Sequence, residues 1–529
     1  MPVGGSGLDL NGFLLGEETN DMSQYLLGID NGSTVVKAAL FSTDGTDVAV
    51  AAKKIPLSSP QPGYSEVDME VLWGLTVEAI CEAIQQAGVT GKDILGAACT
   101  GHGNGLYLVD HDLRPVRPAI RGADTRAREY IDRWLADGVD VAVRPKTMQA
   151  IWPAQPNALM AWMRDHEPDS LRKAVANLTV TDYVRLRLTG QLAAELTNQS
   201  GTSLMNVGTG QYDPEVLEAF GIAEMQRLLP PLCRSEEIGG TVTKAAAEAT
   251  GLAVGTPVAG GLFDIDACGL ASGLVDESQL CMIAGTWGNN QYIAPRPVVH
   301  QDVFMTTRYA IDGYFLMLEG SATSASNLEW FVTEFFQAER KQAEAEGDSI
   351  YQWCDRLVAH TDPGESGTVF LPFLHGSNVS LDGKGAFFGL DAWQSRGHVL
   401  RAIYEGIVFS HHWHLDRLLQ FRSLPSQIRL SGGAARSEVW LQMFADILQV
   451  PVEVPAGTEL GALGAAIAAA VAAGCYDDLN AACQSMVRIE RACQPNPKLA
   501  DLYREKYDRY LRLLQVMAPA WSELAWKTR

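Results

Sequence analysis

Short apolar runs rich in β-branched residues alternate with amphipathic helical patterns along most of this chain. Residues 25–29 and 35–41 have the continuous apolar character of buried strands, and residues 94–99 show it again. The pattern between Asp68 and Gly88 predicts a helix, because an acidic residue precedes its first turn and a glycine follows its last. Strands and helices that alternate in this way indicate layered α/β structure.

The second half of the chain repeats this arrangement. Its predicted strands lie at 280–284, 314–318 and 428–430, and a helix is predicted over 438–450. Residues 459–466 then open an alanine-rich helix, whose small side chains predict packing too close for bulkier residues. The last fifty or so residues have the pattern of amphipathic helices.

The length of the chain predicts more than one domain. Its 529 residues exceed the roughly 250–300 at which a single core stops growing. A run rich in Gly, Ser and Asp at about 271–278 divides the two halves, so we predict a first domain over 23–272 and a second over 273–529. Residues 1–22 are rich in glycine and acidic residues and lack the basic start of a signal peptide, which predicts a disordered extension.

Composition narrows the class of function. With 41 basic and 63 acidic residues, the formal charge is -22, which argues against nucleic acid or an anionic membrane as a main partner. It does not argue against ATP, because backbone donors and a metal can hold phosphates locally. No stretch approaches the roughly 18 apolar residues of a membrane span. Nine scattered cysteines without a C-x-x-C pair predict reduced thiols in a cytoplasmic protein.

The turn after the first strand has the composition of a phosphate-binding turn. Asp30, where the strand ends, is placed to hold a magnesium ion through water, and Lys37 adds a positive charge close by. Gly32 permits a tight turn, while Asn31, Ser33 and Thr34 leave backbone N–H groups free to face phosphate oxygens. Two further strands end in comparable turns, at Gly285-Thr286 and at Gly432-Gly433.

Three such junctions in two halves, with Asp264 ending the first half, resemble the sugar kinase, actin and heat-shock chaperone superfamily. That resemblance implies an α/β fold of two actin-like (ribonuclease H-like) ATPase domains with a cleft between them. Further segments are similar to motifs of the FGGY carbohydrate kinases: 182–190 (DYVRLRLTG), 370–376 (FLPFLHG) with 385–390 (GAFFGL), 401–407 (RAIYEGI) and 431–437 (SGGAARS). The resemblance covers about residues 25–475.

The resemblance implies a role for each matching residue. Asp264, after Gly260-Gly261, stands where the family has its catalytic aspartate and is assigned as general base. Asp266 is the rival for that role, although helical geometry turns it away from Asp264. Asp30 resembles the aspartate that anchors Mg²⁺. The predicted ATP contacts are Asn31, Gly32, Ser33, Thr34 and Lys37 near the transferred phosphate, Gly285 and Thr286 at the β- and γ-phosphates, and Gly432, Gly433 and Arg436 along the adenosine.

The predicted sugar contacts follow the third strand. His102, Gly103 and Asn104 occupy the segment that contacts the sugar in this family, and Asp124 is similar to its second sugar-binding aspartate; Asp264 completes the set. The GHGNGLY pattern more nearly resembles kinases of L-xylulose and of small polyols such as erythritol. Glycerol or ribulose kinase activity remains an alternative, as does a sugar sensor without catalysis.

Three further expectations concern assembly, metal binding and a rival class of protein. A homodimer is implied by the resemblance alone. The spacing of His411, His412 and His414 resembles a metal cluster, but their place on the helix after Glu405-Gly406 predicts packing instead. A chaperone-like ATPase is a rival class, but it would need a peptide-binding β domain that the predicted helical tail does not offer.

Overall fold

The computed structural model describes residues 24–524 except 322, 375, 378, 380 and 381. The extension predicted to be disordered, residues 1–22, lies outside this part of the chain. Within the described residues, no helix combines the length and the apolar character that a membrane span needs.

A seven-stranded sheet organises the first half of the described chain. Its strands, in spatial order, are β13 (Ile238–Thr241), β14 (Pro257–Ala259), β5 (Ile94–Gly101), β1 (Tyr25–Asn31), β2 (Val35–Ser42) and β3 (Asp47–Lys54), with β15 (Leu262–Phe263) paired to β5. The pairs β1–β2 and β2–β3 are antiparallel, whereas β1–β5 and β5–β14 are parallel. The antiparallel strands β1, β2 and β3 come first along the chain, and the strands that pair in parallel, β5 and β14, follow after crossover connections.

The second half contains a sheet with the same plan. Its strands, in spatial order, are β18 (Met305–Arg308), β19 (Phe315–Ser321), β17 (Gly288–Ala294), β16 (Gln279–Ala284), β22 (Gln427–Ser431), β23 (Val452–Pro455) and β24 (Ile489–Cys493). The pairs β16–β17 and β17–β19 are antiparallel, and β16–β22 and β22–β23 are parallel. The order β19-β17-β16-β22-β23 therefore repeats the order β3-β2-β1-β5-β14, as expected for two related domains.

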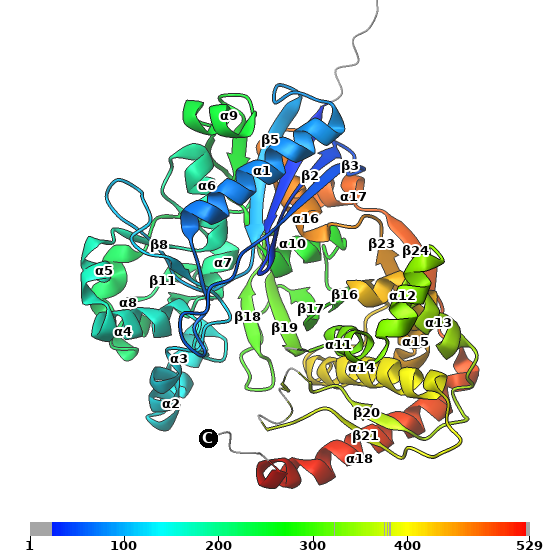
Figure 1. Cartoon of the computed structure of the whole chain (residues 1–529). Coiled ribbons are helices and arrows are strands. Elements are labelled where there is room, and N and C mark those ends of the chain that lie inside the picture. The colour runs from blue at the N-terminus through cyan, green and yellow to red at the C-terminus, as the bar shows by residue number, and fades with distance from the viewer. Residues whose placement is uncertain (1–23, 322, 375, 378, 380–381, 525–529) are drawn as a thin grey trace, which may run out of the picture.

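Helices cover both sheets (Figure 1). In the first half they are α1 (Met69–Ala87), α2 (Arg128–Ala136), α3 (Val139–Thr147), α4 (Pro156–His166), α5 (Pro168–Lys173), α6 (Val180–Thr189), α7 (Leu196–Ser200), α8 (Pro214–Ala219), α9 (Lys244–Thr250) and α10 (Asp264–Ala271). In the second half they are α11 (Ser326–Phe335), α12 (Gln337–Ala345), α13 (Ile350–Ala359), α14 (Arg396–Leu418), α15 (Glu438–Leu448), α16 (Leu460–Ala472), α17 (Leu479–Met486) and α18 (Ala500–Leu524).

Short elements complete the fold. The 3₁₀ helices are η1 (Ala223–Leu228), η2 (Gly433–Arg436) and η3 (Pro497–Leu499). The two-stranded pairs are β4 (Glu66–Val67) with β7 (Ala119–Ile120), β6 (Tyr107–Val109) with β8 (Ala176–Leu178), β9 (Ala194–Glu195) with β12 (Leu232–Cys233), β10 (Met205–Asn206) with β11 (Gln211–Tyr212), and β20 (Val369–Leu371) with β21 (Ala386–Phe388).

Helices α10 and α16 lie between the two sheets (Figure 1). Although α16 follows β23 in the chain, it packs against β1 and β5 of the first sheet and against α10. A Cβ atom at Gly28 of β1 would lie 1.9 Å from the carbonyl oxygen of Ala462, and one at Gly464 would lie 2.1 Å from that of Ala267. The predicted close packing of this helix is therefore confirmed, and a single apolar core joins α10, α16 and side chains of both sheets.

The predicted local elements are mostly confirmed. Asp68 caps α1 by accepting hydrogen bonds from the N–H groups of Glu70 and Val71, and Gly88 follows it in the left-handed conformation. The prediction for the tail was wrong in one respect, since it includes β24 as well as helices. This strand pairs antiparallel with β23 at the edge of the second sheet, a contact that periodicity within the tail does not reveal.

Candidate active site

Strand register brings the predicted catalytic residues to one edge of the first sheet. Leu262 of β15 pairs with Thr100 of β5, Thr100 pairs with Asp30 of β1, and Asp30 pairs with Lys37 of β2. Parallel strands present their carboxyl ends at the same edge, where ligands bind in open α/β sheets. Asp264 follows β15 directly, so it lies at this edge close to Asp30.

Asp30 is held between a cation and the start of α16. The ammonium of Lys37 forms an ion pair with Glu459, at 2.5 Å between Nζ and Oε2. A Cβ atom at Gly461 would lie 2.7 Å from the Asp30 carboxylate, so glycine is needed for this approach. Burial raises the pKa of Asp30 to about 6, opposed by Lys37 and assisted by Glu459. Lys37, predicted near the transferred phosphate, is thus already paired to an acid.

Asp264 begins α10 and keeps part of its surface open to solvent. Burial, and after it the negative charge of Asp30, raise its pKa to about 7, although backbone N–H groups oppose the shift. Two carboxyl groups thus face each other at the sheet edge. A carboxyl whose pKa lies near neutrality suits proton acceptance from a hydroxyl.

Asp266 points elsewhere, as the helical geometry predicted. It is fully buried, and its Oδ1 accepts a hydrogen bond from the N–H of Ala310 in the turn between β18 and β19. Burial raises its pKa well above the usual range, which favours the neutral form. This environment favours Asp264 over Asp266 as the proton acceptor.

A chain of hydrogen bonds holds the residue before Asp264. The N–H of Phe263 donates to Thr197 Oγ1 at 2.9 Å, and that hydroxyl donates to Glu195 Oε2 at 2.7 Å. Glu195 is completely buried and also accepts from Ser235 Oγ and from two N–H groups at the start of α7. Because the Thr197 hydroxyl donates to Glu195, its oxygen is free to accept from the Phe263 N–H.

We expect Thr197→Val to lower kcat about tenfold, because a small displacement of a reacting group is enough for such a loss. The change keeps the side-chain shape and removes the hydroxyl. The KM for ATP should stay within about twofold, since the nucleotide residues lie elsewhere. Thr197→Ser restores the hydroxyl and should restore kcat. Steady-state kinetics of both variants check this, and an equal loss in both would contradict it.

The predicted sugar segment lies directly against Phe263. A Cβ atom at Gly103 would lie 2.4 Å from the Phe263 ring, so this close approach requires glycine. Asn104 adopts the left-handed conformation, with φ of 64°, and is buried. Its Oδ1 has no hydrogen-bond partner among the described residues. An amide oxygen left free beside the catalytic edge is suited to a sugar hydroxyl.

His102 and Asp124 are engaged by the protein itself. The Nδ1 of His102 contacts the carbonyl of Gly103 at 3.2 Å, and its Nε2 contacts the Tyr107 hydroxyl at 3.1 Å. Burial and Arg121 lower the pKa of His102 to about 4, so its ring is neutral. Asp124 is 1% exposed and accepts two hydrogen bonds from the Arg126 side chain and one from the Ser65 N–H. A sugar hydroxyl would have to compete with these partners.

The predicted phosphate turns of the second half lie together. A Cβ atom at Gly432 would lie 2.8 Å from the N of Gly285, so the turns after β16 and β22 touch. The N–H of Ala325 donates to the Gly285 carbonyl at 2.8 Å and steadies the turn. Thr286 is exposed. The other predicted nucleotide residues that face solvent are Ser33, Thr34, Gly432, Gly433 and Arg436.

The three histidines of α14 contact other side chains of the protein. The Nδ1 of His411 lies 2.8 Å from Asn290 Oδ1, and its Nε2 lies 2.9 Å from Ser324 Oγ. Burial lowers the pKa of His411 to about 3, so it is neutral. Within the part of the chain that the structure describes, no three His, Cys, Asp or Glu side chains are grouped to hold a metal.

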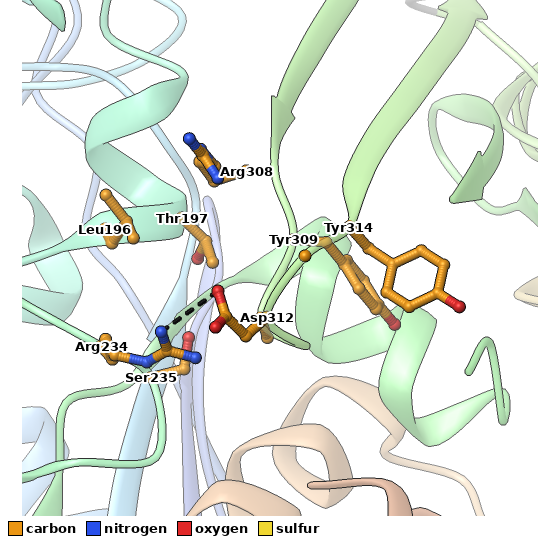
Figure 2. Close-up of a pocket in the computed structure, with 10 residues that line it drawn as sticks. Leu196, Thr197, Arg234, Ser235, Arg308, Tyr309, Asp312 and Tyr314 are labelled. Atoms are coloured by element: carbon orange, nitrogen blue, oxygen red, sulfur yellow. Dashed lines mark ion pairs between the residues drawn. The ribbon is translucent and has the colours of Figure 1, made fainter. Parts of the chain in front are cut away.

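A small pocket lies where the β18–β19 turn meets the first half (Figure 2). Asp312 of that turn forms an ion pair with Arg234, at 3.2 Å between Oδ1 and Nη1. Nearby, Arg308 donates hydrogen bonds to the carbonyls of Val207 and Gly208. This contact joins the two halves away from the phosphate turns. The pocket is also lined by Thr197, the residue that holds Phe263.

Sequence reasoning missed several residues of the site. Glu459 and Gly461 were recognised only as the start of a tightly packed helix, and Thr197 and Glu195 were not singled out. Glu459 lies 422 positions from its partner Lys37. Only the glycine and alanine pattern of 459–466 signalled a close approach, and nothing local to the sequence named its partner.

Comparison with known proteins agrees with this geometry. The family models for the N-terminal and C-terminal domains of the FGGY family of carbohydrate kinases match residues 25–270 and 280–473. The L-xylulose/3-keto-L-gulonate kinase of Escherichia coli K12 is 36% identical over 94% of this chain and 98% of its own length. A probable L-xylulose kinase of Pasteurella multocida is 37% identical over 92% of this chain and 98% of its own length.

The fold is also that of solved relatives. The crystal structure of xylulose kinase from Rhodospirillum rubrum is similar over 94% of this chain and 100% of its own, with a TM-score of 0.82 and 26% identity. The predicted fold of two related α/β domains is therefore confirmed. The chain belongs to the FGGY family of carbohydrate kinases, and it is a phosphotransferase that uses ATP to phosphorylate a sugar hydroxyl.

Proposed function

We propose that this kinase transfers the γ-phosphoryl group of Mg-ATP to a primary hydroxyl of a pentulose, with Asp264 as general base. The observation that carries the proposal is the position of Asp264. It is partly open to solvent at the carboxyl edge of the first sheet, beside Asp30 and next to the segment that contains Gly103. A base there can take the proton of a sugar hydroxyl as that hydroxyl attacks the phosphoryl group.

The remaining predicted residues fit the binding of a nucleotide. Gly285 and Gly432 bring two strand-ending turns together, and exposed backbone N–H groups in such turns favour phosphate oxygens. Thr286 adds an exposed hydroxyl at the same place. The turn from Asn31 to Thr34 faces the phosphates from the first half. Closure of the two halves would bring nucleotide and sugar together and exclude water.

The acidic edge also fits a magnesium ion. Asp30 and Asp264 lie close enough for their charges to interact, and Lys37, across the β-ladder from Asp30, is paired to Glu459. Carboxylate oxygens are the ligands that Mg²⁺ prefers, and it commonly uses one or two of them together with substrate phosphates and water. We therefore assign Asp30 as the residue that holds Mg²⁺. When bound, the ion would neutralise negative charge on the phosphates.

The relatives narrow the substrate class. Their names include L-xylulose, xylulose and 3-keto-L-gulonate, and we propose L-xylulose as the first substrate to test. Erythritol, glycerol and ribulose are alternatives from the sequence. The free amide oxygen of Asn104 offers a hydrogen-bond acceptor to a polyhydroxy chain. A cytoplasmic homodimer with the domain boundary at 272/273 completes the proposal.

Coupled measurement of ADP release with Mg-ATP tests this function. The panel is L- and D-xylulose, L- and D-ribulose, 3-keto-L-gulonate, erythritol, glycerol and the pentitols. We expect a strong, saturable preference for a pentulose, because rejection of analogues follows when buried polar groups lose their partners. A preference for glycerol or erythritol would change the proposed substrate class from pentuloses to small polyols. No stimulation of ADP release by any of them would favour a sugar sensor.

A further inference from the structure

Arg121 is a buried cation without an acidic partner. Only 4% of it is exposed, and among the described residues its guanidinium has no ion pair. Its sole side-chain hydrogen bond to the described part of the chain is long, 3.4 Å from Nη1 to Ser65 Oγ. Burying a charge without a counter-charge is strongly unfavourable. Such an arrangement is most easily explained by a ligand that supplies the missing anion.

Two arginines close to Arg121 in sequence show the usual arrangement. Arg117 is paired with Glu66 and Glu167, at 2.6 and 3.1 Å. Arg126 is paired with Glu66 and Asp124, at 2.8 and 2.9 Å. The fold therefore brings carboxylates to both of its neighbours, whereas no ion pair with Arg121 forms among the described residues.

Arg121 lies against the predicted sugar segment. A Cβ atom at Gly105 would lie 3.3 Å from the Cα of Arg121, and one at Gly122 would lie 2.8 Å from the carbonyl oxygen of Gly103. Its positive charge also lies close enough to His102 to lower the pKa of that ring. His102 cannot act as the counter-charge, because an imidazole is either neutral or positively charged. Gly103 in turn touches Phe263, the residue before Asp264, so Arg121 and the base flank one segment.

We propose that Arg121 determines substrate specificity by binding a carboxylate on the sugar, so that the enzyme accepts keto-sugar acids as well as neutral pentuloses. This inference rests on the proposed function. A guanidinium binds a carboxylate through two parallel hydrogen bonds, which gives both strength and orientation. The acid group would lie at the end of the chain away from the hydroxyl that Asp264 deprotonates. Asn104 Oδ1 would accept a hydrogen bond from a hydroxyl between them.

The test compares one acid with one neutral sugar. The kcat/KM values for 3-keto-L-gulonate and for L-xylulose are measured for the wild type, Arg121→Gln and Arg121→Lys. We expect the wild type to use both. Arg121→Gln should lower the value for the acid by about tenfold or more, because a charge-assisted pair is lost, and change that for L-xylulose by less than about threefold. The kcat/KM of Arg121→Lys for the acid should lie between those of the wild type and Arg121→Gln, since lysine keeps the charge but lacks the planar guanidinium.

Thermal unfolding without ligand gives an independent result. Because Arg121→Gln removes a buried, unpaired charge, its midpoint should equal or exceed that of the wild type. Arg117→Gln is the matched control. It breaks two ion pairs in the same segment, so it should lower the midpoint while leaving the ratio of the two kcat/KM values unchanged.

Other outcomes would overturn the proposal. An equal loss for both sugars in Arg121→Gln, or a wild type that phosphorylates L-xylulose and not the acid, would refute a carboxylate-binding role and leave the kinase assignment intact. A wild type that phosphorylates no member of the sugar panel would refute the proposed function itself, and this inference with it.

Discussion

Replacing Asp264 with asparagine should lower turnover by about 100- to 10,000-fold, the range in which a positioned general base contributes. The amide cannot accept the proton of the attacking hydroxyl, although it nearly preserves the size of the side chain. The Kd for ATP should stay within a few fold, because the phosphate turns at Gly285 and Gly432 are untouched. Coupled kinetics with the preferred sugar and calorimetric titration with ATP provide the two measurements.

Asp266→Asn is the matched control for this result. Asp266 is buried, and burial raises its pKa well above the usual range, so asparagine matches the neutral form that burial favours. The amide oxygen can also accept the hydrogen bond from Ala310. This variant should retain most of its activity. If Asp264→Asn instead remained fully active and Asp266→Asn were inactive, the base would have to be reassigned.

Replacing Gly464 with alanine should destabilise the whole molecule. The added Cβ would lie 2.1 Å from the carbonyl oxygen of Ala267, a backbone atom that cannot rotate away. Overfilling a packed core usually costs about 1–3 kcal/mol and occasionally more. We expect the upper end or beyond, because α10 and α16 lie between both sheets. The thermal midpoint should fall by several degrees, or the protein should not accumulate in folded form.

Gly74→Ala provides the comparison. Gly74 is also helical, in α1, but no atom lies within 4 Å of the position that its Cβ would take. Alanine there should leave the midpoint unchanged or raise it, since glycine in a helix is less stable than alanine by roughly 0.5–1 kcal/mol. Equal midpoints for the two variants would show that the helices can separate without loss.

The sequence predicted the strand–turn junctions of the candidate site well. Asp30, Gly285 and Gly432 lie where apolar strands meet glycine turns, and periodicity with turn chemistry is enough to identify such junctions. Asp264 was recognised through the family motif rather than through its chemistry. The two ends of α1, at Asp68 and Gly88, were predicted from capping preferences alone.

The parts that were missed depend on contacts between distant segments. The Lys37–Glu459 pair joins residues 422 positions apart, and β24 is a strand because β23 lies beside it. The residues next to Arg121 in the sequence do not mark it as unusual. It is unusual because the fold buries it without a carboxylate among the described residues, while the nearby Arg117 and Arg126 form ion pairs. Periodicity reports the burial of a face, but it does not report which segment covers that face.

The position of α16 has a consequence for synthesis of the chain on the ribosome. Strands β1 and β5 are among the first elements to emerge, yet the helix that covers one of their faces begins only at Leu460. At 5–20 residues per second, translation needs roughly 20 to 90 seconds to span that interval. During this time the nascent first sheet exposes apolar surface that its own half of the chain does not cover. The amino-terminal half is therefore a natural client for a chaperone, and it should aggregate when expressed without the remainder.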